Sequence, residues 1–206
     1  MRVLLVSDVE EPALWDYYRP GSLSGIDLIL SAGDLKAAYL EFLVTMANRP
    51  LIYVHGNHDG LYEKTPPEGC DCAEDTLLQV KGLRILGLGG SGWYSGGKFQ
   101  YTERQMERRI RKLDRRIKKA GGVDLVLAHA PVRGYGDDET PAHRGFEAFL
   151  PLIDKWQPRW FVHGHVHLNY RNDSRRLYRR GETDIINACG RCVIDTEAEQ
   201  TQIMLR

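Results

Sequence analysis

Five short segments of the sequence are rich in residue types that bind divalent metal ions. Carboxylates, an amide oxygen and imidazoles form mixed oxygen and nitrogen shells, and one carboxylate can lie between two ions. A lone histidine is more often structural, but four of the seven histidines lie in these segments, so a purely structural role would need several coincidences. The segments are Asp8-Val9-Glu10, Gly33-Asp34, Gly56-Asn57-His58-Asp59, the isolated His129 and Gly164-His165-Val166-His167.

Each of these segments directly follows a short apolar run that is typical of a buried β-strand. The runs cover residues 3–6, 27–30, 51–54, 124–128 and 159–162. Ligands of α/β sheets gather at the carboxyl ends of the strands. We therefore expect the five segments to converge on one crevice.

The rest of the chain predicts further strands and helices. Apolar residues recur at helical spacing over residues 35–46 and 106–117, and a third helix is predicted over 146–156. A strand pair is expected at 77–80 and 83–88, turned at Lys81-Gly82, and more strands are expected between 176 and 204. The pattern indicates an α/β fold with mixed sheets covered by helices.

Composition argues for one globular domain without a charge bias. The 206 residues suffice for a substantial core, and 28 Lys plus Arg balance 28 Asp plus Glu, so no net charge attracts nucleic acid or membrane. The apolar run at the start ends at Ser7-Asp8, too early for a signal peptide, and no stretch is long enough to span a bilayer. We expect a cytoplasmic protein.

The four cysteines form one C-x-C pair, Cys70 and Cys72, and one C-x-x-C pair, Cys189 and Cys192. A structural zinc site built from both pairs is one interpretation, but C-x-C is poor zinc spacing. Ordinary reduced thiols are favoured for a cytosolic chain.

The ordered motifs from Asp8 to His167 resemble those of the calcineurin-like metallophosphoesterases. The family pattern is D-x-H, G-D, G-N-H-D or G-N-H-E, an isolated His and G-H-x-H, and this chain departs from it at one position. The resemblance implies a single calcineurin-like phosphoesterase domain over residues 1–206, folded as a four-layer α-β-β-α sandwich with two mixed sheets. It also implies a hydrolase that cleaves phosphate esters with a metal-activated water at a dinuclear centre.

The same resemblance implies a role for each motif residue. His58 would not bind metal but would act as a general acid near the leaving group, with Asp59 orienting its imidazole. The implied metal ligands are Asp8 and His167 at one ion, Asn57, His129 and His165 at the other, and Asp34 between the two.

Glu10 is the departure, because it stands where the family has the histidine of D-x-H. Glutamate is a competent ligand, so we count Glu10 among the metal residues, and the alternative is that it points to solvent and the first ion binds weakly. An oxygen-rich shell favours Mn²⁺ as the cofactor, with Fe, Mg²⁺ or Zn²⁺ as alternatives.

Two further features concern the substrate. His143 and Arg144 precede the predicted helix 146–156, and helix N-termini and arginines both bind phosphate, so we include them as candidate substrate-binding residues. A capping or surface role for His143 is the alternative. The glycine-rich residues 87–97 lack the Gly-Lys-Ser/Thr ending of a phosphate-binding P-loop and are interpreted as a tight loop bordering the site.

The sequence favours a phosphodiesterase or a small-molecule phosphatase acting on a small phosphate ester. Protein phosphatases of this superfamily usually carry Arg before G-N-H-E, whereas this chain has His55 there and Asp59 in place of the Glu. One alternative is a binding scaffold that keeps the fold without catalysis. Such a scaffold resembles the retromer subunit, whose metal site is degenerate. The other is a nuclease-like enzyme that uses the basic residues of 104–119 and 171–180, although a solvated helix face explains the first segment better. The oligomeric state stays open.

Overall fold

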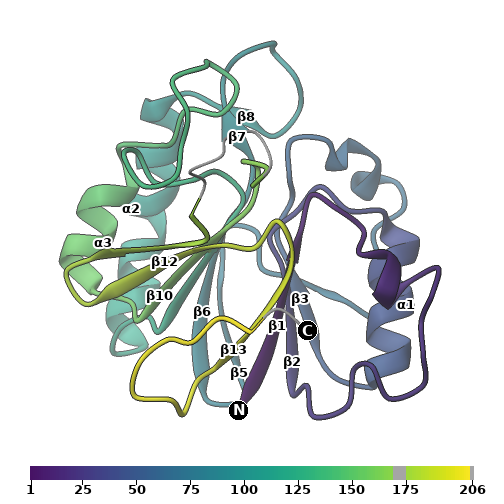
Figure 1. The fold of residues 1–206 in the computed structure, drawn as a ribbon. Coiled ribbons are helices and arrows are strands. Elements are labelled where there is room, and N and C mark those ends of the chain that lie inside the picture. The colour runs from purple at the N-terminus through teal and green to yellow at the C-terminus, as the bar shows by residue number, and fades with distance from the viewer. Residues whose placement is uncertain (169–174, 205–206) are drawn as a thin grey trace.

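The computed structural model describes residues 1–168 and 175–204, which form two large mixed sheets with helices outside them (Figure 1). In spatial order, the first sheet contains β13 (Gly190–Asp195), β1 (Arg2–Ser7), β2 (Leu28–Ser31), β3 (Leu51–Tyr53) and β4 (Asp71–Cys72). The second contains β11 (Leu177–Arg180), β12 (Thr183–Asn187), β10 (Trp160–His163), β9 (Leu125–Ala128), β6 (Leu83–Leu88) and β5 (Leu77–Val80).

The remaining elements are short apart from two helices. They are α1 (Ala37–Ala47), α2 (Glu103–Lys119), α3 (Phe149–Trp156), the 3-10 turns η1 (Pro12–Leu14) and η2 (Asp59–Glu63), and the paired β7 (Ser91–Gly92) and β8 (Gln100–Tyr101). Figure 1 shows α1 outside the first sheet and α2 and α3 outside the second.

Strand alternation explains why the helices lie outside. Successive side chains of a strand point to opposite faces, so a strand that is apolar throughout needs partners on both. In β1, Val3 and Leu5 pack in the core between the sheets, whereas Leu4 and Val6 pack in the outer core with residues of α1. The outer face of the second sheet packs in the same way on α2 and α3. The predicted four-layer α-β-β-α sandwich is confirmed.

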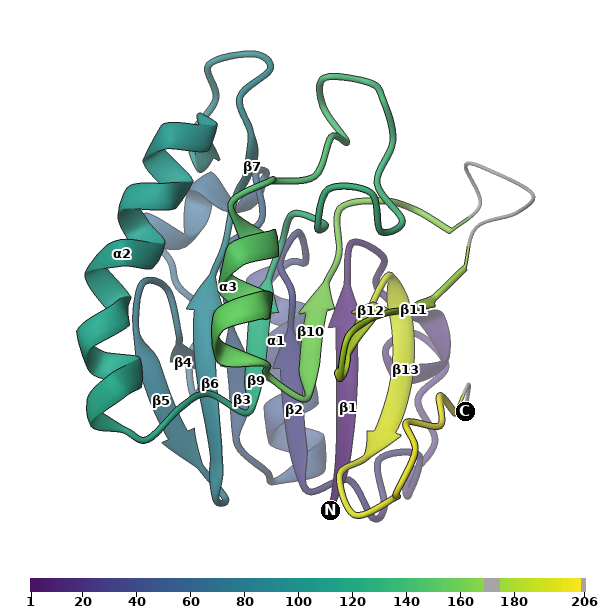
Figure 2. The same ribbon diagram turned by 90° about the vertical axis from the view of Figure 1, so that its left-hand side faces the viewer.

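The strands that lead into the five motifs are parallel within their sheets. β1, β2 and β3 are parallel in the first sheet, and β9 and β10 are parallel in the second. Antiparallel strands occur only at or near the edges of the described sheets, where β13, β5 and β11 lie. The predicted mixed sheets are therefore confirmed, and the loops after the parallel strands gather at one end of the sandwich (Figure 2).

Helix α2 forms where periodicity predicts it. Thr102 and Gln105 make a capping box at its start, which satisfies backbone N–H groups that have no partner inside the helix. Met106, Leu113 and Ile117 are buried against the second sheet, and the other face of α2 is exposed and basic. Of the second basic segment, 171–180, residues 171–174 lie outside the described residues.

The third helix begins three residues later than its pattern indicates, at Phe149 rather than 146. Phe146 instead bridges to Val132, and the backbone N–H of Ala148 donates to the carboxylate of Glu103 at 2.5 Å. A contact from α2 therefore sets the start of α3. As a consequence, His143 and Arg144 do not sit at the N-terminus of α3, which corrects the prediction of a phosphate-binding helix end there.

The two cysteine pairs lie at opposite edges of the first sheet. Cys72 is in β4 and Cys192 is in β13, and all four cysteines are free. One zinc site cannot include both pairs. None of the helices among residues 1–168 and 175–204 is long and apolar enough to cross a membrane.

Candidate metal centre

Three of the motif residues adopt a backbone conformation that ordinary side chains rarely take. The φ angles of Asp8, Asp34 and His165 are 63°, 58° and 68°. A non-glycine residue in this left-handed region is strained by about 1–3 kcal/mol and persists only where the surrounding structure imposes it. Such strain is concentrated at functional sites.

Two glycines allow the motif loops to approach closely. A Cβ atom on Gly56 would lie 2.0 Å from Asp34 Oδ1, and one on Gly164 would lie 1.9 Å from Ser7 Oγ and 2.5 Å from Asp8 Oδ2. Neither glycine has a positive φ. Their role is to leave room for the neighbouring loop.

The centre of the site is a cluster of three side chains from both sheets. One ligand atom each of Asp34, His129 and His165 can be chosen so that all lie within 4.8 Å of one another. His129 Nε2 lies 3.3 Å from Asp34 Oδ2, 3.1 Å from His165 Nδ1 and 2.9 Å from Asn57 Oδ1. The structure thus brings together the four residues assigned to one ion or to both.

Backbone carbonyls fix the orientation of both imidazoles. His129 Nδ1 donates to the carbonyl of Ala32 at 2.7 Å, and His165 Nε2 donates to that of Ala142 at 2.5 Å. A carbonyl can only accept, so these nitrogens carry the hydrogens. The opposite nitrogens, which face the cluster, are then the ones available to a cation, as in metal sites whose histidines are held by outer partners.

The pKa values of the cluster residues depend on one another. Burial lowers the pKa of His129, but the carboxylates of Asp34 and Asp8 outweigh it and raise the pKa to about 9. Burial likewise opposes the charge of Asp34, yet His129 outweighs it and lowers that pKa to about 2. For His165, burial and the neighbouring charge of His129 lower the pKa to about 3. The carboxylates around His129 thus favour a positive charge at this position, and the donor set of one carboxylate and two imidazoles fits a divalent ion.

The residues assigned to the other ion are arranged less tightly. Both carboxylate oxygens of Asp8 accept from the backbone N–H of His165, at 3.0 and 2.9 Å, and burial raises the pKa of Asp8. His167 is half-buried. Burial lowers the pKa of His143, and the neighbouring charge of His167 adds to that effect. Glu10 accepts from Lys36 Nζ at 2.8 Å and from Lys36 N–H at 3.2 Å. Metal binding by Glu10 therefore stays a prediction.

His58 and Asp59 both contact the loop that carries Asp34. The side chain of His58 is exposed, and its backbone N–H donates to Asp34 Oδ1 at 2.8 Å. Asp59 is buried, and its Oδ2 accepts from the backbone N–H of Gly56 at 2.7 Å and of Asp34 at 2.9 Å. These bonds join the Asp34 loop to the Asn57 loop. The orienting of His58 by Asp59 stays a prediction.

The two candidate substrate residues lie at different distances from the cluster. The His143 ring is 5.2 Å from that of His165, and Thr140 Oγ1 is 3.0 Å from His143 Nδ1. Arg144 is exposed and lies 3.7 Å from Glu139. His143 thus borders the cluster, whereas Arg144 faces solvent beside an acidic side chain.

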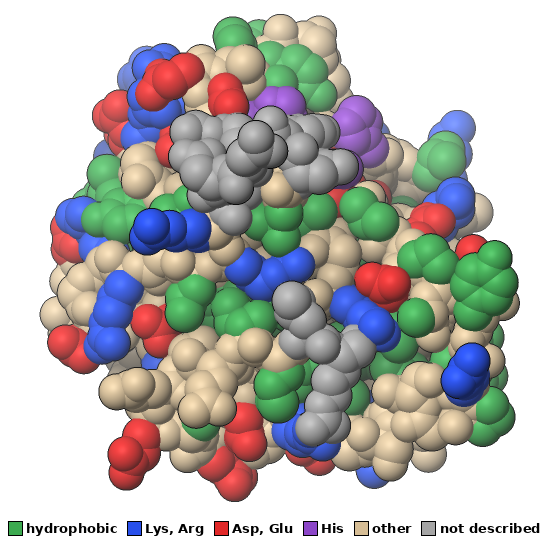
Figure 3. Space-filling view, viewed as in Figure 1, with side chains coloured by type: hydrophobic (Ala, Val, Ile, Leu, Met, Phe, Trp, Pro, Cys, Tyr) green, Lys and Arg blue, Asp and Glu red, His purple; other side chains and the backbone are tan. Residues whose placement is uncertain are grey.

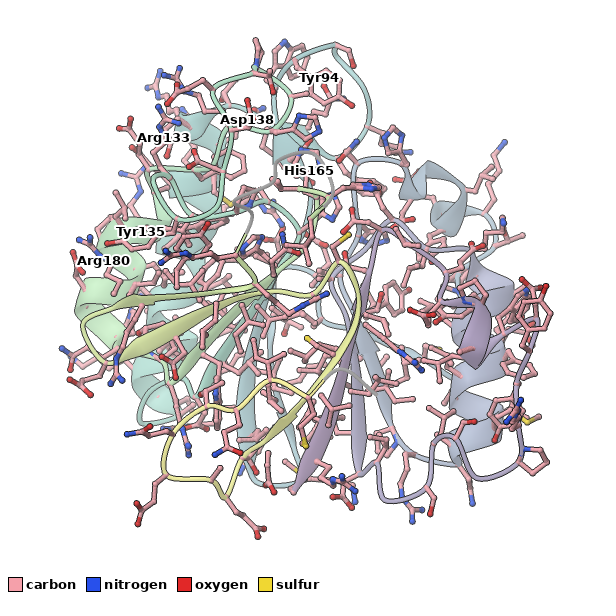
Figure 4. The ribbon with its side chains drawn as sticks, viewed as in Figure 1. Tyr94, Arg133, Tyr135, Asp138, His165 and Arg180 are labelled. Atoms are coloured by element: carbon pink, nitrogen blue, oxygen red, sulfur yellow. The ribbon has the colours of Figure 1, made fainter. Side chains whose placement is uncertain are left out.

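Sequence reasoning missed Tyr94, which lies in the glycine-rich loop. Its hydroxyl oxygen accepts from Asn57 Nδ2 at 3.1 Å, and Figure 4 shows Tyr94 on the loop above His165. The glycine-rich composition indicated a loop bordering the site, and the structure confirms this. It gave no sign that one tyrosine of that loop would reach an assigned ligand.

Comparisons with solved structures agree on the fold. The chain is similar to protein TT1561 of Thermus thermophilus (18% identity, TM-score 0.69), covering 98% of this chain and 97% of that one. It is also similar to GAP50, the anchor in the inner membrane complex of Plasmodium, with 13% identity and a TM-score of 0.57. That likeness covers 94% of this chain and 80% of the other. A third likeness is to a novel archaeal phosphodiesterase, with 15% identity, a TM-score of 0.50 and coverage of 99% of both chains.

Comparison with protein families identifies the chain more specifically. No curated protein sequence shows significant similarity to it. The family model described as calcineurin-like phosphoesterase matches residues 1–169, a range that contains all five motifs. The chain therefore belongs to the calcineurin-like phosphoesterase family.

Proposed function

We propose that this protein is a metal-dependent hydrolase of small phosphate esters, acting as a phosphodiesterase or a small-molecule phosphatase. The observation that carries the proposal is the cluster of Asp34, His129 and His165, whose free imidazole nitrogens and carboxylate face one another. Bound divalent ions, Mn²⁺ above all, would supply a water of lowered pKa and positive charge for the phosphate oxygens.

The chain's own residues would have three tasks in this reaction. Asp34 would serve both ions, and its contacts with His129 Nε2 and with the backbone N–H of His58 support this role. The bonds of His129 and His165 to backbone carbonyls would keep their other ring nitrogens directed at the ions. His58 is exposed at the edge of the cluster, where its imidazolium can donate a proton to the departing oxygen. Histidine side chains also reach the molecular surface in this part of the molecule (Figure 3).

The environment of His55 supports a small substrate rather than a phosphoprotein. His55 stacks on Phe99 with ring centroids 4.3 Å apart, and its Nδ1 lies 3.2 Å from Glu74. It is therefore engaged inside the protein, at the position where protein phosphatases of the superfamily usually carry an arginine.

A panel of chromogenic esters tests the proposal. With Mn²⁺, the protein should hydrolyse bis-p-nitrophenyl phosphate or p-nitrophenyl phosphate, and Asp34→Asn should be inactive on both. Higher activity on the diester identifies a phosphodiesterase, and higher activity on the monoester a phosphatase. Protein that takes up Mn²⁺, Fe, Mg²⁺ or Zn²⁺ but hydrolyses neither ester nor cyclic nucleotides would contradict the proposal.

That negative outcome would favour the scaffold alternative. The fold is shared by the archaeal phosphodiesterase and by the Plasmodium anchor protein, so it does not decide between catalysis and binding. The residues of the site favour catalysis, because all assigned positions except Glu10 match the family motif.

A further inference from the structure

A largely buried carboxylate outside the metal cluster, that of Glu74 with 16% of its side chain exposed, joins two of the loops that form the site. Glu74 Oε2 accepts from the backbone N–H of His55 at 3.1 Å, and Glu74 Oε1 accepts from the backbone N–H of Gly89 at 3.1 Å. The first loop carries Asn57 and His58, and the second carries Tyr94. One carboxylate thus holds the starts of both loops at a fixed separation.

The fit around Glu74 is tight. A Cβ atom on Gly89 would lie 2.3 Å from Glu74 Oε2 and 2.4 Å from the carbonyl of His55. That carbonyl accepts from the backbone N–H of Gly90 at 2.7 Å, and the carbonyl of Gly90 accepts from Ala130 N–H at 3.2 Å. The connection therefore continues to the residue that follows His129.

The charge that balances Glu74 comes from helix α2. Arg109 is 8% exposed, and its Nη2 donates to Glu74 Oε1. Its Nη1 donates to the carbonyl of Gly89 at 2.8 Å, its Nε donates to Asp75 Oδ1 at 2.8 Å, and its guanidinium lies 4.2 Å from the ring centroid of Tyr101. Burial opposes the charge of Glu74, but His55 and Arg109 outweigh it and lower the pKa of Glu74.

We infer that the Glu74–Arg109 pair is a positioning device that holds Asn57 at the metal centre by fixing the loops on either side of it. The loop of His55 sets the backbone of Asn57, and the loop of Gly89 brings Tyr94 to its amide group. The guanidinium bonds both to Glu74 and to the loop that Glu74 holds, so its removal loosens both. This inference rests on the proposed function, because it assigns the pair a purpose at that site.

The position of the pair distinguishes it from an ordinary surface ion pair. Arg84 and Asp124 form a comparable pair on the second sheet, with Arg84 Nε and Nη2 donating at 2.9 and 2.6 Å. Arg84 lies near the start of β6, whereas Gly89 directly follows the end of that strand. Arg84→Met is therefore a matched control that removes the same charge at the other end.

The test compares Arg109→Met and Arg84→Met with the wild type. Calorimetric titration with Mn²⁺ should show weaker binding in Arg109→Met by about tenfold, the lower range for outer partners of metal ligands. Arg84→Met should bind as the wild type does. Hydrogen exchange without metal should rise in Arg109→Met over residues 55–60 and 89–95, and Arg84→Met should leave these segments protected. Arg109→Lys, which keeps the charge, should lie between wild type and Arg109→Met.

Wild-type affinity and exchange in Arg109→Met would overturn the inference, as would a rise in exchange spread evenly over the chain. If Arg109→Met does not fold, Glu74→Gln must show the same local exchange and weaker Mn²⁺ binding, and wild-type behaviour there would overturn the inference equally. Failure of the wild type to bind metal or cleave esters refutes the proposed function instead. The exchange comparison does not depend on that result.

Discussion

The two halves of the candidate metal centre are built differently. In the half with His129 and His165, each imidazole is held by a backbone carbonyl, and Asn57 is bound by Tyr94. In the half with Asp8 and His167, the carboxylate accepts from a backbone N–H, and the extra carboxylate of Glu10 is paired with Lys36. The first half is preorganised for a cation, whereas the second must exchange an existing ion pair to use Glu10.

This difference predicts that the two ions bind stepwise. A site whose ligands are already oriented loses little freedom on binding, so it should fill first. A site that must break the Glu10–Lys36 contact should fill second and more weakly. Asp34 is assigned to both ions, and its backbone N–H donates to Asp59.

The largest expected effect is loss of both ions in Asp34→Asn. If Asp34 bridges the ions as proposed, the substitution removes a negative charge that both ions need, so neither half keeps its affinity. Metal analysis should find close to two ions per chain in the wild type and almost none in the variant. Full occupancy in Asp34→Asn would show that Asp34 does not bridge.

His58→Ala should keep both ions and lose rate. A proton donor of this kind contributes about 10²–10⁴-fold, and the loss should shrink for p-nitrophenolate, which leaves without protonation. Steady-state rates on an alkyl ester and on a p-nitrophenyl ester, each with Mn²⁺ titration, give the comparison. Loss of an ion in His58→Ala would contradict its assignment as an acid.

Glu10→Ala should weaken only the second ion, by about tenfold, as removal of a partner of a metal site does. Added Mn²⁺ should partly restore activity, and Lys36→Met, which frees the Glu10 carboxylate, should bind the second ion at least as well as the wild type. If Glu10→Ala binds both ions with wild-type affinity, Glu10 is a partner of Lys36 and not a ligand.

The pair that supports the preorganised half should make the metal-free protein sensitive to acid. The pKa of Glu74 in the folded state lies below its ordinary value of 4.5, so Glu74 stabilises the fold above that pH. This stabilisation by the Glu74 carboxylate is lost as pH falls through the pKa of the folded state. Between the unfolded and folded pKa values, the loss is about 1.4 kcal/mol per pH unit. Urea unfolding of wild type and Glu74→Gln should differ most at neutral pH and converge in acid. A constant difference between pH 7 and pH 3 would refute this.

The smallest effect is expected from the basic face of α2, which belongs to neither half. Reversing Arg108, Arg111 and Arg115 to Glu should leave hydrolysis of small diesters unchanged, because all three are exposed. In Figure 3, Lys and Arg side chains are interspersed with Asp and Glu on the face shown. Loss of activity on oligonucleotides alone, with a steep salt dependence, would restore the nuclease-like alternative.

Much of the fold and of the centre follows from the sequence because the signals are local. A buried strand shows as a short apolar run, and a motif residue directly after it lies at the carboxyl end of the strand whatever the rest of the chain does. For this reason the strands before Asp8, Asp34 and His129 and their convergence are predictable. The φ strain at Asp8 is not, because only the packed loops impose it.

Contacts between side chains that are distant in the sequence depend on the tertiary structure and could not be predicted. Glu10 meets Lys36, Asn57 meets Tyr94, and Glu74 meets Arg109 across 35 residues. Arg109 belongs to a helix whose charge pattern indicates a solvated face, and no local rule marks it as buried. Helical periodicity gives the buried stripe of α2, but only the neighbouring loop supplies the carboxylate that makes a buried arginine stable there.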